Sequence, residues 1–585
     1  MIKRIYATQT SVSWIFHTLC GVSSVLLTHC DSPENSQDVR TIDSGLVRDV
    51  GAPTDMGPSP DQPNADGSLD VATSGDGSTQ SDAQPDALDA SAADVSSFDP
   101  SRIPQAASYL VGIIGTGQSL SVGATSIPVL STTQRFGNVR LRDMGIAPLY
   151  DGAGDRLSLV PLVEPIRAEV AAAGGAYPTN ILGETPHSGM ANELSNYALN
   201  RAAVAFASAH SVVGESGQLL SVIRRGGTGR AYASSLYEVR SITALARGDG
   251  RRYFVGAVIL THGESDTANA LYGDGLLALA NAYRMDLPVI TGQREPIPLI
   301  LSQQGSFPAG AGRSLSTQAM WRVSVDNPGV ILCSGPKYQY EYSPDHVHLT
   351  ATASRALGIK YAEVYARHTW DNQPWQPLEP TRIRRSSDTE ITVDFNVPNP
   401  PMQWEESVAL PHTTTHPTSG PPPAQWARGR GFEVEQAGRV LTISDVTIRG
   451  QSVAITMMAA LAVGDFTVRY AMTQDAPGYT AGTAWGRQGQ LRDSDTYAGH
   501  DQIQIQAMMT NNARRAVIAA VPTQHGVRAL LRGPGFPAVG SVITGFPTAM
   551  SMDFSLPWTG PSGMATVSIQ SDQRNYAVQF EMVGR

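Results

Sequence analysis

A serine at the end of an apolar run, and a distant aspartate–histidine pair, are the residues in this sequence best suited to chemistry. Ser119 follows the apolar run 109–114 and a turn that contains two glycines. Asp345 and His348 lie three residues apart, much later in the chain. A serine hydroxyl becomes an effective nucleophile when an imidazole takes its proton, and a carboxylate can orient that imidazole. The three residue types therefore indicate nucleophilic chemistry, provided that the fold brings them together.

The segments around these residues predict a frame that can do so. From about 105 to 368, short runs rich in Val, Ile and Leu alternate with helical stretches. Such runs are typical of strands covered on both faces, and the alternation predicts an α/β fold with a doubly wound parallel sheet. The expected strands are 109–114, 211–213, 254–261, 298–302 and 329–333, and the expected helices are 189–208, 231–246, 276–285 and 350–367. Because chemistry in this architecture collects at the carboxyl ends of the strands, the serine and the Asp–His pair would face one crevice.

The pattern changes after Trp370. The Pro-rich stretch 397–425 breaks any helix, and the runs around it alternate polar and apolar residues, as half-buried strands do. The expected strands are 390–395, 431–435, 439–448, 452–457 and 465–472. We therefore expect a β-sandwich-like domain. The sequence leaves open whether the last runs, 502–506 and 576–582, complete that sandwich or form a separate β unit.

Three sequence blocks resemble those of SGNH (GDSL-type) hydrolases, in the form found in sialate O-acetylesterase-like carbohydrate esterases. The segment 117–120 reads Gly-Gln-Ser-Leu, like the first block of that superfamily. The segment 260–266, Leu-Thr-His-Gly-Glu-Ser-Asp, is similar to its Gln-Gly-Glu-Ser-Asp block, and 345–348 matches its closing Asp-x-x-His block. The blocks occur in the family's order and span 108 to about 368. The resemblance implies a flavodoxin-like sheet, with Ser119 as nucleophile, His348 as general base and later acid, and Asp345 as the group that orients His348.

The resemblance also implies an oxyanion hole, which acyl transfer needs because a tetrahedral intermediate carries negative charge; losing one donor typically costs ~100–1,000-fold in rate. The backbone amide of Ser119 is one candidate donor. The family takes a second from a glycine after the second strand, where Gly217 stands, with Gly227 as the alternative. The third position, often Gln in relatives, is His262 here. A neutral imidazole can donate a hydrogen bond, and the alternative is that His262 only packs beside the strand end.

The first 30 residues have the layout of an export signal. Lys3 and Arg4 precede an apolar stretch, 11–27, that is too short for a comfortable membrane span. It ends in Leu-Leu-Thr-His-Cys, which resembles the lipobox of bacterial lipoproteins and would make Cys30 the lipidated residue. The alternative is a plain secretory signal. We expect an exported bacterial protein, either a cell-envelope lipoprotein or a secreted one, that meets a membrane only through this anchor.

An acidic stretch, 31–104, follows the signal and is rich in Asp, Ser, Pro and Gly. Residues 31–100 hold fifteen acidic residues against two Arg, a charge of −13, whereas the whole chain has −10. Such a segment buries too little apolar surface to order itself, so we expect a disordered tether. The remainder is near neutral, which gives no reason to expect nucleic-acid binding. The chain has only three cysteines, Cys20, Cys30 and Cys333, and no metal-ligand spacing, so neither a disulfide framework nor a metal or other cofactor is expected.

These expectations divide the chain into a signal (1–30), a tether (31–104), a hydrolase domain (105–370) and a β-rich accessory region (371–585). Within the last, Val-Arg-Tyr-Ala at 468–471 is similar to a segment in the β domains of exported sialate O-acetylesterase-like proteins. The expected function is an exported serine esterase that removes O-acetyl groups from carbohydrate through an acyl-Ser119 intermediate. The alternatives are a lipase or esterase for longer acyl esters, and a non-catalytic glycan-binding protein on the same scaffold.

Overall fold

The computed structural model describes only part of the chain. The described residues are 98–142, 158–166, 183–305, 314–343, 345, 347–405, 428–472, 488–510, 515–518, 529–532, 552–554 and 563–585. The chain divides into two units, Met1–Ala90 and Ser91–Arg585. The first unit, with the predicted signal, Cys30 and most of the predicted tether, lies outside the described residues, so those expectations stay predictions.

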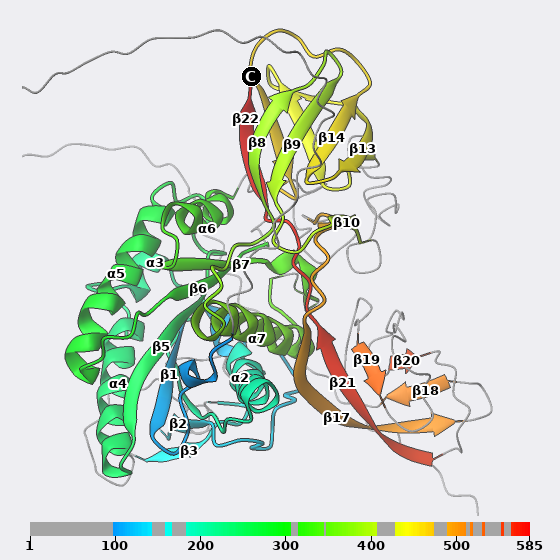
Figure 1. The fold of residues 1–585 in the computed structure, drawn as a ribbon. Coiled ribbons are helices and arrows are strands. Elements are labelled where there is room, and N and C mark those ends of the chain that lie inside the picture. The colour runs from blue at the N-terminus through cyan, green and yellow to red at the C-terminus, as the bar shows by residue number, and fades with distance from the viewer. Residues whose placement is uncertain are drawn as a thin grey trace, which may run out of the picture. The chain divides into compact units, whose positions relative to one another are not determined.

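A seven-stranded mixed sheet carries the first half of the second unit, in the order β3-β2-β4-β1-β5-β6-β7 (Figure 1). All neighbouring strands are parallel except β3, which runs antiparallel to β2. The five strands β4-β1-β5-β6-β7 reproduce the flavodoxin-like order, so the predicted doubly wound α/β fold is confirmed. The strands are β1 (Tyr109–Gly117), β2 (Val139–Leu141), β3 (Leu159–Pro161), β4 (Ser208–Val212), β5 (Arg252–Thr261), β6 (Leu299–Gln303) and β7 (Ile331–Pro336).

Helices cover both faces of this sheet (Figure 1). Alternate residues of β1 belong to different buried clusters, since successive side chains of a strand point to opposite faces. Val111 and Ile113 pack with α2 and α7, whereas Leu110 and Ile114 pack with α4, α5 and α6. The helices are α2 (Pro186–Ala202), α3 (Leu220–Ile223), α4 (Ala231–Gly248), α5 (Tyr272–Thr291), α6 (Leu315–Asp326) and α7 (Ala351–Tyr365).

Several boundaries differ from the sequence-based expectation. The helix expected at 189–208 begins at Pro186, where the Thr185 hydroxyl caps it by accepting the His187 N–H. It ends at Ala202 because Ala203 adopts a left-handed conformation, with φ 54°, and β4 then begins at Ser208. Helix α6 and the three-residue strands β2 and β3 were not expected. Three residues are too few to show a period in the sequence.

The second half of the unit is built from antiparallel sheets, which confirms the predicted β-sandwich-like region. Two four-stranded sheets, β12-β11-β15-β22 and β13-β14-β9-β8, contribute alternate residues to one buried cluster, as the facing sheets of a sandwich do. The last strand, β22, completes the sandwich, whereas β17 to β21 form a separate five-stranded sheet. Their bounds are β8 (Glu379–Arg385), β9 (Glu390–Asn396), β10 (Gln403–Trp404), β11 (Phe432–Gln436), β12 (Arg439–Leu441), β13 (Ile443–Arg449), β14 (Ser452–Met457), β15 (Phe466–Tyr470), β16 (Leu491–Arg492), β17 (Ala498–Thr510), β18 (Arg515–Ile518), β19 (Ala529–Arg532), β20 (Met552–Phe554), β21 (Gly563–Asp572) and β22 (Phe580–Gly584).

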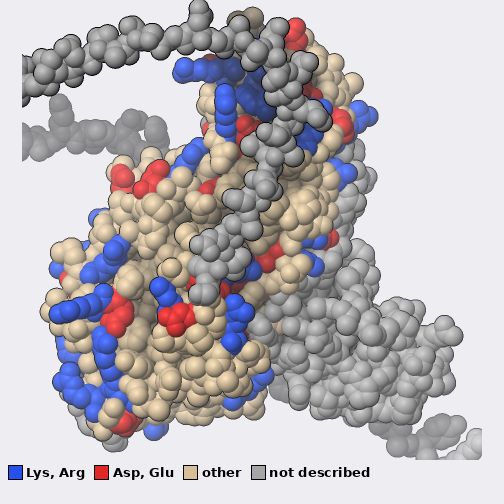
Figure 2. Space-filling model, in the orientation of Figure 1, with Lys and Arg blue, Asp and Glu red and all other residues tan. Residues whose placement is uncertain are grey.

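The described surface carries both signs of charge. On the face shown in Figure 2, acidic and basic side chains lie interspersed. Arg384 of β8 pairs with Asp394 of β9 at 3.5 Å, and Arg449 of β13 pairs with Glu390 of β9 at 2.9 Å. Among the described helices, none is long and apolar enough to cross a membrane.

Candidate active site

The candidate nucleophile stands at a tight turn after the central strand. Ser119 opens a short 3-10 helix, η2 (Ser119–Val122), directly after β1 and its following residue Gln118. The turn depends on Gly117, whose φ is 137° and where an added Cβ would lie 2.1 Å from the Thr261 carbonyl oxygen of β5. The Gln118 N–H donates to that same carbonyl, at 3.1 Å. Close approach of the two strand ends therefore fixes the backbone immediately before Ser119.

The aspartate and the histidine lie on a small closed loop after β7. Tyr342 and Leu349 form an isolated antiparallel bridge at its base, and the Ser343 N–H donates to the His348 carbonyl at 2.7 Å. Inside the loop, Asp345 Oδ1 accepts two backbone N–H groups, at 2.9 and 3.0 Å. Short aspartate side chains stabilise turns in this way. The carboxylate thus organises the loop that carries it.

The structure brings Ser119, His348 and Asp345 together in one hydrogen-bonded chain. His348 Nε2 lies 2.7 Å from Ser119 Oγ, and His348 Nδ1 lies 2.7 Å from Asp345 Oδ2. A carboxylate only accepts hydrogen bonds, so Nδ1 carries the proton and Nε2 accepts from the serine hydroxyl. Burial raises the pKa of Asp345, but the hydrogen bonds from His348 and from the two loop N–H groups outweigh it and leave that pKa at about 2. The chain is therefore arranged for proton transfer from Ser119 to His348.

Two backbone amides near the serine are available as oxyanion donors. The segment after β4 runs beside the serine turn, since the Glu215 N–H donates to the Gly117 carbonyl at 2.9 Å. Among the described residues, no hydrogen-bond partner is found for the N–H of Ser119 or of Gly217. Gly217 has a φ of 71°, a left-handed conformation that favours glycine. In contrast, the Gly227 N–H donates to the Arg224 carbonyl at 2.9 Å, so the geometry favours Gly217.

The expectation that His262 donates directly to the oxyanion does not fit the structure. Its side chain is fully buried, and both ring nitrogens have partners. Nε2 lies 3.0 Å from the Gln218 carbonyl oxygen, and Nδ1 lies 2.8 Å from the Tyr272 hydroxyl. Because a carbonyl only accepts, Nε2 carries the proton and Nδ1 accepts from Tyr272. Burial lowers the pKa of His262, with the charge of Asp266 opposing it, in keeping with a neutral ring.

His262 instead belongs to a group of side chains that hold the Gly217 segment. Its neighbours on the same loop contact the same stretch of backbone. The Ser265 hydroxyl donates to the Gly217 carbonyl at 3.2 Å, and Asp266 Oδ2 accepts the Leu220 N–H at 2.8 Å. Three residues of the loop after β5 thus contact successive parts of the segment 217–220. The resemblance of 260–266 to the family's Gln-Gly-Glu-Ser-Asp block located the loop but not the direction of its side chains.

Sequence reasoning missed two further links near the site. Ser265 also donates its backbone N–H to Gln118 Oε1, at 3.3 Å, which connects the loop after β5 to the residue before the nucleophile. Lys337, directly after β7, is fully buried and forms an ion pair with Glu264. Breaking a buried pair by removing one partner typically costs ~3–5 kcal/mol, because the other charge stays buried. The sequence signal for this pair is weak, a lysine four residues after the apolar run 330–333.

Comparisons with known proteins give relatives only at the level of structure. A scan against protein-family models finds no match, and neither does a search of curated proteins. Among solved structures, the chain is similar to a carbohydrate acetylesterase from Xanthomonas citri, with 13% identity and a TM-score of 0.39, over 66% of this chain and 81% of that one. It is also similar to NanS, with 11% identity and a TM-score of 0.30, over 44% and 97%. A carbohydrate acetylesterase from Sinorhizobium meliloti gives 13% identity and a TM-score of 0.22, over 44% and 99%.

These neighbours include carbohydrate acetylesterases, the class of protein that the three sequence blocks indicate.

Replacing His262 with leucine is expected to lower kcat about 10- to 100-fold while KM changes little, since full loss of an oxyanion donor costs ~100–1,000-fold and here the donor is only displaced. The physical reason is the loss of the hydrogen bond to Gln218, which holds the Gly217 segment. His262→Gln keeps an N–H donor on a side chain of similar reach, so it should recover most of the rate. Steady-state kinetics of both variants, beside their melting temperatures, makes the comparison. A leucine variant that keeps wild-type kcat would show that His262 has no part in positioning.

Proposed function

We propose that this protein is a serine esterase that removes O-acetyl groups from carbohydrate through an acyl-Ser119 intermediate. The observation that carries the proposal is the chain from Ser119 Oγ through His348 to Asp345, with both hydrogen bonds at 2.7 Å. A hydroxyl donating to a neutral imidazole, itself oriented by a carboxylate, is the arrangement that activates serine for attack on a carbonyl. The Ser119 and Gly217 amides supply donors beside it.

The reaction then follows in two halves. Ser119 Oγ attacks the ester carbonyl carbon while His348 Nε2 takes its proton, and the negative charge on the carbonyl oxygen is stabilised by the Ser119 and Gly217 N–H groups. Collapse of this intermediate breaks the bond to the sugar oxygen, which receives the proton from His348. Water then attacks the acyl-serine with His348 again as base, and releases the acid and free Ser119. Asp345 stays ionised throughout and holds the imidazole in place.

The acetyl group and the carbohydrate are supported by the three sequence blocks, which resemble the carbohydrate esterase form of the SGNH pattern. The separate predictions of export, of lipidation at Cys30 and of an acidic tether rest on the sequence alone.

Release of acetate from acetylated glycans by the full chain tests the proposal. We expect acetate release from at least one such glycan. We also expect a kcat/KM for 4-nitrophenyl acetate at least about tenfold above that for the octanoate ester, which corresponds to a difference of ~1.4 kcal/mol or more between the two activation barriers. Rapid acid quenching followed by mass spectrometry should find the acetyl group on the peptide that contains Ser119. A preference for octanoate would support the longer-acyl alternative. Glycan binding without turnover of any ester would support a binding protein and overturn the proposal.

A further inference from the structure

The C-terminal strand of the sandwich is held along one edge by side chains of the hydrolase half. β22 is an edge strand that pairs with β15 on its other side. The side-chain amide of Gln303, at the end of β6, accepts the Gln579 N–H at 2.8 Å and donates to the Gln579 carbonyl at 2.9 Å. Gln318 of α6 makes the same pair of bonds to Glu581, both at 2.9 Å. Residues two apart on a strand present their backbone groups on one edge, so the two glutamines stand in for a neighbouring strand.

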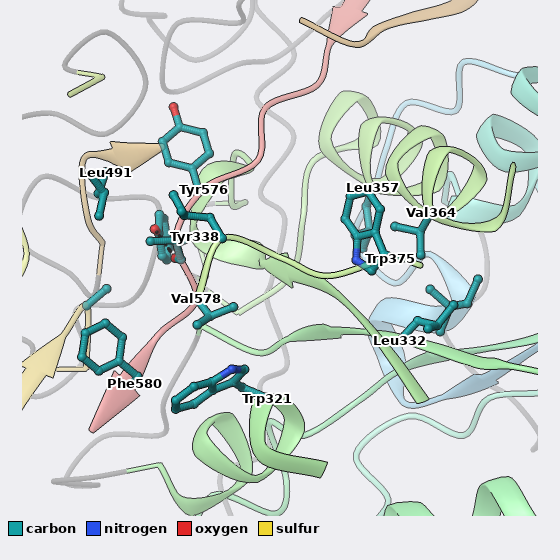
Figure 3. Packing of buried hydrophobic residues seen from close by; sticks show 14 of the residues in the cluster. Trp321, Leu332, Tyr338, Leu357, Val364, Trp375, Leu491, Tyr576, Val578 and Phe580 are labelled. Carbon is teal, nitrogen blue, oxygen red and sulfur yellow. Dashed lines mark hydrogen bonds between the residues drawn. The ribbon is translucent and has the colours of Figure 1, made fainter. Parts of the chain in front are cut away.

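Aromatic side chains fill the contact around this strand (Figure 3). The rings of Tyr338 and Tyr576 meet edge to face, with centroids 5.9 Å apart, and Trp321 lies 6.1 Å from Phe580. All four rings are buried and belong to one apolar cluster with residues from both halves. The Tyr338 hydroxyl also donates to the Ala577 carbonyl, at 2.8 Å. The contact therefore resembles a domain core rather than a loose linker between two modules.

Tyr338 connects this contact to the loop that carries the catalytic pair. It lies in η3 (Lys337–Gln339), the short 3-10 helix directly after β7. Four residues later, Tyr342 forms the bridge to Leu349 that closes the loop of Asp345 and His348. A further contact reaches the helix after the loop, since Gln573 Nε2 donates to the Ala356 carbonyl of α7 at 3.1 Å. The C-terminal segment thus contacts the chain on both sides of the Asp345–His348 loop.

We infer that the part of the C-terminal segment before β22, residues 573–577, is a positioning element for the Asp345–His348 loop, so that the β region contributes to the geometry of the catalytic site. The bonds inside the loop set its shape, whereas its position depends on its base, where Tyr342 continues from a helix whose Tyr338 is bound by the C-terminal segment. Loosening that contact lets the loop move, and His348 moves with it. Catalysis requires His348 Nε2 to stay within hydrogen-bond reach of Ser119 Oγ. The catalytic consequence rests on the proposed function, whereas the structural role does not.

Two variants weaken the contact near the loop, one from each half, and a third is the matched control. Tyr338→Phe removes the hydrogen bond to Ala577 and keeps the ring, and Tyr576→Leu removes the edge-to-face partner from the C-terminal side. Gln318→Leu removes two hydrogen bonds to the same strand, but α6 carries no residue of the hydrogen-bonded chain. All three are made in the full chain. Hydrogen–deuterium exchange of the amides in 343–348 is measured with kcat, KM and the melting temperature.

We expect exchange of the loop amides to rise about tenfold in both tyrosine variants and to stay within about twofold in Gln318→Leu. A tenfold rise corresponds to ~1.4 kcal/mol, which lies within the range of a lost hydrogen bond and of a lost edge-to-face ring pair. On an acetate ester, kcat of the tyrosine variants should fall about tenfold with KM nearly constant, because a shift of ~1 Å at a catalytic group is already costly. Equal exchange in all three variants, or none above wild type, would overturn the inference. A wild-type chain without esterase turnover would overturn the proposed function alone, since the exchange result still decides the structural role.

Discussion

Replacing Ser119 with alanine is expected to lower kcat by about 10⁴- to 10⁶-fold, and His348→Ala should have an effect of similar size. The two residues act as one unit: without the hydroxyl the imidazole has no proton to take, and without the imidazole the hydroxyl is a weak nucleophile. The double variant should therefore be hardly slower than either single one. The residual rate would come from substrate binding and from the backbone donors, chiefly the Gly217 N–H.

The measurement is kcat and KM for 4-nitrophenyl acetate in the wild type, the two single variants and the double variant. Ser241→Ala is a suitable control, because Ser241 lies on α4 and its hydroxyl donates to the Tyr237 carbonyl of the same helix. This variant also removes a serine hydroxyl, but from a helix on one face of the sheet. If the effects of Ser119→Ala and His348→Ala multiply in the double variant, the two residues act independently and the proposed mechanism is wrong.

The parallel sheet could be predicted because its central strands are apolar on both faces, and its flavodoxin-like order was implied by the resemblance of the three sequence blocks. β1 and β5 are buried along almost their whole length, so their sequences read as continuous apolar runs. The missed elements give weaker signals. β2 and β3 are three residues long, and α6 buries Ser316, Thr317 and Ser324 beside its apolar residues, which blurs its helical period.

The site was predictable in its positions but not in the directions of its side chains. The spacing of Asp345 and His348 made their contact predictable, because two residues three apart in a short loop can reach each other. His262 shows the limit: its position after β5 is that of the family's Gln-Gly-Glu-Ser-Asp block, but its nitrogens turn to Gln218 and Tyr272. Which partners the His262 nitrogens contact depends on packing between the loop after β5 and the segment after β4. The Glu264–Lys337 pair joins residues far apart in the sequence and likewise depends on the completed fold.

Asp345 sets the pH range over which the hydrogen-bonded chain stays intact. Its pKa of about 2 lies below the ordinary value of an aspartate in an unfolded chain, ~3.9. A carboxyl whose pKa is depressed by folding adds stability above the unfolded value, and that contribution is lost as the pH falls toward 2. Protonation of Asp345 is therefore not the cause of any loss of activity between pH 8 and pH 4. In Asp345→Asn this part of the pH dependence of the free energy of unfolding should be absent, which urea titrations at pH 3 and pH 6 would show.

Asp345→Asn should lower kcat about 10⁴-fold at pH 7, even though the asparagine fits the loop. Asparagine Oδ1 can still accept the N–H groups of Val347 and His348, so the loop should keep its shape. Its NH₂ group, however, can donate to His348 Nδ1, and this stabilises the tautomer whose Nε2 carries the proton and cannot accept from Ser119. Asp345→Ala loses both the orientation of the ring and the two bonds within the loop, so it should also destabilise the chain. If Asp345→Asn retains kcat within tenfold of the wild type while its melting temperature is unchanged, then the carboxylate does not select the tautomer of His348.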